Sequence, residues 1–227
     1  MQLQFARRMS DIKASEIREI LKVTEKEDVI SFAGGLPASE LFPIKEIDEV
    51  SRGVLKESGT KALQYTTTEG YAPLRKWIAD RMNTRLSTSF DEDNILITHG
   101  SQQGLDLSGK VFLDEGDIVL CESPTYLAAI SAFKAYGCHF IEIPTDGDGM
   151  VMDFLEDVLK KTNGIKLIYV IPTFQNPTGK TWSLERRKRL AELSAKYSIP
   201  VVEDNPYGEL RFEGESLPSV KSFDAKG

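Results

Sequence analysis

The stretch IKLIYVIPTFQNPTGKT, residues 165–181, decides the fold class of this 227-residue chain. It opens with a run of branched apolar residues, as expected of a strand that is buried on both faces of a sheet. A polar loop follows, and the amphipathic segment 183–197 after it predicts a helix. A strand, a loop and a helix in this order are the repeating unit of a parallel α/β sheet.

The same alternation continues on both sides of this stretch. Further apolar runs predict strands at residues 95–98, 117–121, 139–143 and 199–203. Helical spacing predicts helices at residues 8–24, 44–58, 73–85, 102–113, 126–136 and 153–161. DGDGM, residues 146–150, is expected to form a turn, because Met150 and Val151 stand where a calcium loop needs an oxygen ligand and a glycine. The sequence therefore predicts a three-layer α/β/α domain with a mostly parallel sheet.

The overall charge excludes several classes of partner. The chain has 28 Lys and Arg against 35 Asp and Glu, a net charge of −7, so binding to nucleic acid or an anionic membrane is not expected. No apolar run approaches the roughly 20 residues that cross a bilayer, and we expect a cytoplasmic protein. Cys121 and Cys138 form no ligand spacing with the two histidines, so no metal site is predicted. The expected partners are small molecules or another protein chain.

Polar residues follow the predicted strands, and in a parallel sheet these carboxyl ends meet at one edge. Gly100, Ser101 and Gln102 follow the first run and open a helix, whose free N–H groups and positive dipole end favour a phosphate. The alternative is that Ser101 only caps the helix.

Asp204 closes the last strand, and a carboxylate there needs a cation, a metal or a strong donor nearby. A protonated heterocyclic nitrogen would meet that need; a helix cap or a salt bridge to a core arginine is the alternative. Tyr207 and Asn176 add a phenol and an amide that can bind one phenolate oxygen, and Tyr126 offers a flat face for a ring.

Gly179-Lys180-Thr181 is typical of a nucleotide-binding loop, but the rest of that pattern is missing. Phe174 stands where the first glycine belongs, and prolines 172 and 177 remove two backbone donors. A P-loop-like NTPase is therefore only a remote alternative.

Six motifs occur together, in one order: FAGGLPASELFP, LQYTTTEGYAPLR, ITHGSQQGLDL, ESPTYLAAI, PTFQNPTGKT and VVEDNPYGELRF. In this order they resemble the fold-type I, class I/II aminotransferases that use pyridoxal 5'-phosphate, in the branch of 2-aminoadipate and aromatic aminotransferases. The resemblance implies transfer of an amino group from an α-amino acid to a 2-oxo acid. It covers nearly the whole chain.

The resemblance also implies a role for each motif residue. Gly100, Ser101 and Gln102 would bind the cofactor phosphate, and Tyr65 would reach the phosphate in a partner subunit of a homodimer. Tyr126 would stack on the ring, and Asp204 would pair with its nitrogen, so these two are the catalytic candidates. Asn176 and Tyr207 would bind the 3-oxygen. The substrate would lie beside Gly34, Gly35 and Asn176.

In the family, the Schiff-base lysine and two arginines come later than DNPYGELRF, and none can be assigned in this sequence. We expect the N-terminal part of a longer enzyme, inactive alone, with residues 1–45 as N-terminal helix and substrate-side loop and 46–227 as a partial cofactor domain. A ligand-sensing domain of a transcription regulator is the alternative function.

Overall fold

The structure, a computed structural model, describes residues 4–9, 29 and 35–224. The chain forms two compact units, Lys13–Thr68 and Met1–Ile12 together with Glu69–Gly227. Of the helices in the described part, none is long and apolar enough to pass through a membrane. Residues 10–24 of the helix predicted at 8–24 lie outside the described residues; the described stretch 4–9 contains the short helix η1 (Arg7–Met9).

The unit Lys13–Thr68 contains the long helix α2 (Ile44–Ala62), preceded by the 3-10 turn η2 (Ser39–Leu41). The predicted helix at 44–58 is thus confirmed, and it continues by one turn past a break at Ser58, whose φ is −140°. Its apolar residues, including Ile44, Ile47 and Val54, are exposed.

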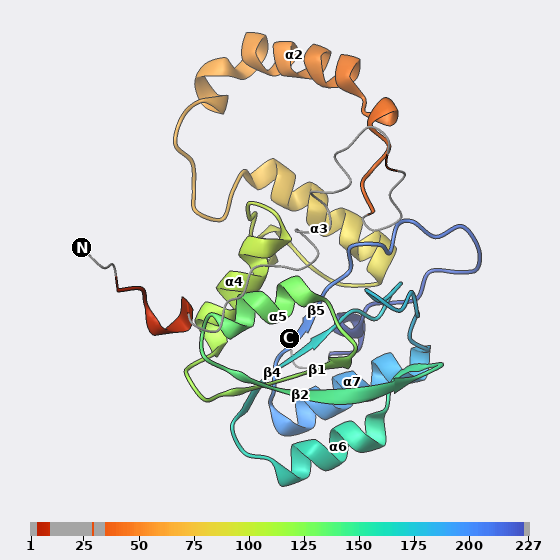
Figure 1. The fold of residues 1–227 in the computed structure, drawn as a ribbon. Coiled ribbons are helices and arrows are strands. Elements are labelled where there is room, and N and C mark those ends of the chain that lie inside the picture. The colour runs from red at the N-terminus through yellow and green to blue at the C-terminus, as the bar shows by residue number, and fades with distance from the viewer. Residues whose placement is uncertain (1–3, 10–28, 30–34, 225–227) are drawn as a thin grey trace. The chain divides into compact units, whose positions relative to one another are not determined.

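The other unit is built on a five-stranded sheet with the order β3-β2-β1-β4-β5 (Figure 1). The three pairings that join β1, β2, β4 and β5 run parallel, as predicted, whereas β3 is antiparallel to β2. The turn predicted at residues 146–150 is present, with Gly147 and Asp148 between these two strands. The strands are β1 (Ile118–Ser123), β2 (His139–Asp146), β3 (Gly149–Met150), β4 (Ile165–Val170) and β5 (Val201–Glu203).

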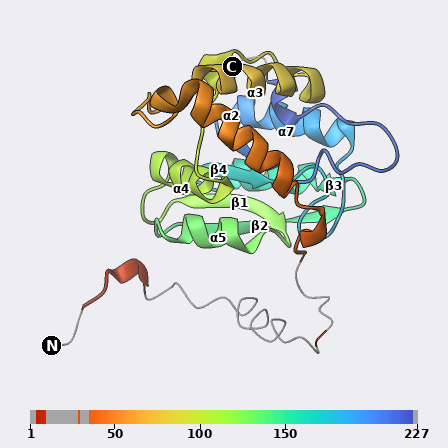
Figure 2. The same ribbon diagram turned by 90° about the horizontal axis from the view of Figure 1, so that it is seen from above.

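Helices cover both faces of this sheet, which confirms the three-layer α/β/α prediction. One face carries α4 (Ser101–Phe112) and α5 (Leu127–Lys134), and the other carries α6 (Met152–Lys161) and α7 (Leu184–Tyr197) (Figure 1). Figure 2, turned by 90°, shows the sheet between α5 and α7. The helix α3 (Ala72–Leu86) belongs to the same unit and has Pro73 in its first turn, as predicted.

Alternation along β4 supplies both cores, because successive side chains of a strand point to opposite faces. Leu167 and Tyr169 belong to the cluster with α4 and α5, whereas Ile168 and Val170 belong to the cluster with α6 and α7. All four are fully buried. The carboxyl end of β4 is thereby fixed between two packed layers.

The predicted strand at residues 95–98 is wrong. Ile95 has extended dihedrals, with φ −110° and ψ 125°, but the segment joins no ladder among the described residues. Leu96 is 53% exposed, and the N–H of Ile97 donates to the carbonyl of Glu69 in a loop. An apolar, extended segment becomes a strand only when a neighbour shares its backbone hydrogen bonds.

Candidate functional site

A small hollow lies beyond the carboxyl ends of β4 and β5. Five residues that the sequence singled out meet there, although they come from four separate loops. One space is thus faced by the start of a helix, an aromatic ring, an amide, a phenol and a carboxylate. The hollow is lined by Ser101, Tyr126, Ile171, Asn176, Asp204, Pro206 and Tyr207.

The start of α4 forms one wall of the hollow. Gly100 is the N-cap residue, with φ 78° and ψ 170°, a backbone conformation that is essentially confined to glycine. No side chain caps this helix end, so the alternative that Ser101 is only a cap is wrong. The first-turn N–H groups of α4 are left without intrahelical acceptors, and they carry the positive end of the helix dipole. This arrangement suits a phosphate.

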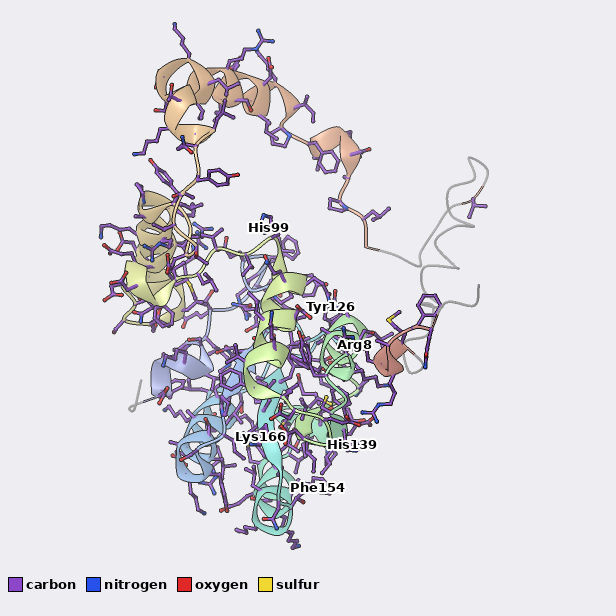
Figure 3. The ribbon with its side chains drawn as sticks, turned by 90° about the vertical axis from the view of Figure 1, so that its left-hand side faces the viewer. Arg8, His99, Tyr126, His139, Phe154 and Lys166 are labelled. Carbon is purple, nitrogen blue, oxygen red and sulfur yellow. The ribbon has the colours of Figure 1, made fainter. Side chains whose placement is uncertain are left out.

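Tyr126 supplies an aromatic ring at the start of α5. It is the N-cap residue of that helix and is half-buried in the wall of the hollow. Figure 3 labels Tyr126 beside α5 and His99 above α4, two helices that pack against each other. The ring therefore stands next to the helix end that suits an anion.

Asp204 follows β5 directly and is held from the buried side. Its N–H donates to the carbonyl of Val170, and its Oδ2 accepts a 2.8 Å hydrogen bond from the phenol of Tyr169. Among residues 4–9, 29 and 35–224, no lysine, arginine or histidine pairs with this carboxylate, and no helix begins there. The helix-cap and salt-bridge alternatives are therefore wrong, and Asp204 faces the hollow as a carboxylate without a cationic partner.

Asn176, in the loop between β4 and α7, lies beside Tyr207, in the loop that follows β5. The amide nitrogen of Asn176 lies 3.5 Å from the phenol oxygen of Tyr207. This is the outer limit of a hydrogen bond, so both groups keep donor capacity for a third oxygen placed between them.

The remaining candidates are placed as follows. Gln102 lies exposed in the first turn of α4 and is not among the residues that line the hollow. Gly34 lies outside the described residues. Gly35 and Tyr65 belong to the unit Lys13–Thr68, and their predicted contacts stay predictions.

Three buried polar residues around the hollow were missed by sequence reasoning. Tyr169 binds Asp204, Glu122 binds two groups at the ends of the loop 171–182, and Gln175 binds groups in two loops. Burial strongly raises the pKa of Tyr169, with the charge of Asp204 adding to the effect, so this phenol acts as a donor only. The sequence signal that could have identified these three residues is a polar side chain inside or beside an apolar run.

The nucleotide-loop alternative finds no support in the geometry. The ammonium of Lys180 donates to the carbonyl of Asp146 at 2.8 Å, and the hydroxyl of Thr181 accepts from the N–H of Phe174. Both groups are turned to the protein and leave no phosphate cradle. Within the part of the chain that the structure describes, no three His, Cys, Asp or Glu side chains gather as a metal site.

Comparison with known proteins identifies the family. Residues 13–226 match the family described as aminotransferase class I and II. The chain is 49% identical to aromatic-amino-acid aminotransferase 1 of Thermococcus litoralis, over 98% of this chain and 54% of the relative. It is 48% identical to 2-aminoadipate transaminase of Thermus thermophilus, over 95% of this chain and 53% of the relative.

A solved structure gives the same result. The fold matches Pyrococcus horikoshii kynurenine aminotransferase in complex with PMP with a TM-score of 0.90 and 45% identity, covering 98% of this chain and 56% of that one. A more distant relative, at 30% identity, is an uncharacterized HTH-type transcriptional regulator of Bacillus subtilis. The chain belongs to the aminotransferase class I and II family, and it spans about half the length of these relatives.

Proposed function

We propose that this chain is the cofactor-binding part of a pyridoxal 5'-phosphate-dependent aminotransferase, which transfers an amino group from an α-amino acid to a 2-oxo acid. The observation that carries the proposal is the meeting of Ser101, Tyr126, Asn176, Asp204 and Tyr207 in one hollow. Family membership supports the same function.

The groups around the hollow fit this cofactor. Asp204 has one oxygen bound by Tyr169 and no cationic partner among the described residues, so a protonated ring nitrogen would satisfy it. The N–H groups at Ser101 and Gln102 would hold the phosphate, and Gly100 lets the chain turn there.

The other side chains would orient the ring. Tyr126 would cover one face of it, and Asn176 and Tyr207 would donate to its 3-oxygen. When bound, the cofactor takes up the electron pair released at the α-carbon of the amino acid. Asp204 would keep the proton on the ring nitrogen, which is the state that withdraws these electrons.

The wider setting is part of the proposal. We infer a homodimer in which Tyr65 reaches the phosphate bound by the partner subunit, with Gly34 and Gly35 beside the substrate. The exposed apolar residues of α2 support an assembly of this kind. The Schiff-base lysine would come from the region that follows residue 227 in the longer relatives, and a cytoplasmic location stays a prediction. The ligand-sensor alternative is less favoured, because the more similar relatives are aminotransferases.

Titration of the chain with pyridoxamine 5'-phosphate tests the proposal. This form carries an amine and cannot react with surface lysines. We expect calorimetry to show binding that Asp204→Asn weakens by about 10- to 150-fold, from the loss of a charge-assisted bond of about 1.5–3 kcal/mol. Asp106→Asn is a matched control, because Asp106 also accepts a tyrosine hydrogen bond, from Tyr136 at 2.9 Å, but does not line the hollow. Absence of binding, or equal effects of both substitutions, would refute the proposal.

A further inference from the structure

Gln175 joins two loops that carry residues of the hollow. Its side chain is buried, with 3% of the residue exposed. Its Nε2 donates to the carbonyl of Pro124 at 2.8 Å, and its Oε1 accepts from the N–H of Thr178 at 2.9 Å and the hydroxyl of Thr178 at 2.7 Å. One side chain therefore binds the β1–α5 loop and the β4–α7 loop at the same time.

We propose that Gln175 is a positioning residue for the cofactor, one that sets the spacing between Tyr126 and Asn176; this inference rests on the proposed function. Tyr126 lies two residues after Pro124, and Asn176 is the residue next to Gln175. Both line the hollow, from different loops. A ring that stacks on Tyr126 and is bound at its 3-oxygen by Asn176 tolerates only a fraction of an ångström of misplacement.

Gln175 links the tip of the β4–α7 loop, residues 174–179, to the β1–α5 loop. Glu122 fastens the two ends of the loop to β1, because its Oε2 accepts from the N–H of Ile171 and its Oε1 accepts from the indole N–H of Trp182, both at 2.8 Å. Between these ends, Phe174 has a φ of 49°, a left-handed conformation that is unfavourable for a residue with a side chain. The tip reaches the β1–α5 loop through the side chain of Gln175.

The chemistry of the bridge requires a glutamine. It needs one donor for the Pro124 carbonyl and one acceptor for the Thr178 donors, at the end of the same side chain. A glutamate would place an oxygen against the Pro124 carbonyl, which needs a donor. An asparagine is shorter by one methylene and would not span the two loops. Methionine keeps the length and removes both hydrogen-bonding functions.

Two substitutions and a control test the inference. Gln175→Met removes the whole bridge. Thr178→Val removes the hydroxyl bond to Gln175, together with a 3.4 Å bond that the hydroxyl accepts from the N–H of Lys180, and keeps the test informative if the first variant does not fold. Asn83→Leu is the matched control. Asn83 is also an amide that closes a loop with three hydrogen bonds, to Phe90 N–H, Phe90 carbonyl and Thr88, but it lines no part of the hollow.

The measurements are calorimetric affinity for pyridoxamine 5'-phosphate, near-ultraviolet circular dichroism of the bound compound, and hydrogen exchange of the free chain. We expect Gln175→Met to weaken binding about tenfold or more, Thr178→Val about threefold, and Asn83→Leu less than about twofold. The dichroism of the bound ring should change only in the first two variants. Amide exchange should rise in both of these variants at residues 125–126, 174–176 and 178–179, which leaves out the two prolines.

The outcomes distinguish failure of the proposed function from failure of this inference. If the unsubstituted chain binds no pyridoxamine 5'-phosphate, the proposed function fails and this inference fails with it. If the chain binds and both Gln175→Met and Thr178→Val leave affinity and dichroism unchanged, this inference alone is overturned. Equal weakening by the Asn83 control would overturn it as well.

Discussion

Replacement of Glu122 by Gln is expected to change how folding stability depends on pH. Glu122 is 1% exposed on β1, and both of its oxygens accept hydrogen bonds. Burial raises the pKa of its carboxyl from 4.5 to about 7, because the charged form loses water; the N–H groups of Ile171 and Trp182 offset part of this effect.

The size of the effect follows from proton linkage. Below pH 4.5 the carboxyl is protonated in the folded and the unfolded chain, so the folded state carries no penalty. As the pH rises from 4.5 to about 7, the unfolded chain releases the proton and the folded chain retains it. Stability therefore falls with rising pH, by about 3 kcal/mol in all, since each pKa unit corresponds to about 1.4 kcal/mol.

Glutamine does not titrate, so the variant escapes this loss. Its amide nitrogen must instead face the N–H of either Ile171 or Trp182, and both are donors. The lost hydrogen bond lowers the free energy of unfolding by about 1–3 kcal/mol at every pH. We expect Glu122→Gln to be less stable than the unsubstituted chain at about pH 5. By about pH 8 the difference should shrink by about 2–3 kcal/mol and can change sign.

Urea unfolding followed by far-ultraviolet circular dichroism, repeated across this pH range, measures the difference. Glu156→Gln is the control, because the hydrogen bond from Lys196 holds the pKa of Glu156 at about 2, against 4.5 when unfolded. That depressed pKa contributes stability above pH 4.5 which is lost as the pH falls through about 2, so the control difference stays flat between about pH 5 and 8. A flat difference for Glu122→Gln as well would refute the reasoning.

Two further substitutions probe the walls of the hollow. Tyr169→Phe removes the donor to Asp204 and should lower the free energy of unfolding by about 1.5–3 kcal/mol in urea; a loss within error would mean that the bond contributes nothing. Gly100→Ala should lower it by about 1–3 kcal/mol through backbone strain alone, because an added Cβ meets no atom within 4 Å. If urea unfolding shows that Gly100→Ala leaves stability unchanged, the positive φ of Gly100 is contradicted.

The elements that sequence reasoning predicted are those with a local cause. The segment 183–197 shows its helix through periodicity, and the structure adds that Ser183 is the N-cap, accepting from the N–H of Arg186. The strand at residues 95–98 failed for the opposite reason. Its apolar residues are local, but a strand also needs a neighbour, and pairing is a property of the assembled sheet.

In the candidate site, too, some residues have a local sequence signal and others do not. Tyr126 and Asp204 could be chosen from the sequence because each follows a strand that the sheet contains, and parallel topology brings carboxyl ends together. Ser101 was chosen after a predicted strand that does not form, and it lines the hollow from the start of α4. For Glu122 and Gln175, which hold these loops in place, the sequence did not indicate the hydrogen-bond partners. Glu122 binds groups 49 and 60 residues away, and Gln175 binds one 51 residues away. A polar side chain next to an apolar strand signals that a partner exists, since burial without one is unfavourable, but which loop supplies the partner depends on the packed fold. The spacing of the groups in the hollow is therefore set by contacts that no local motif contains.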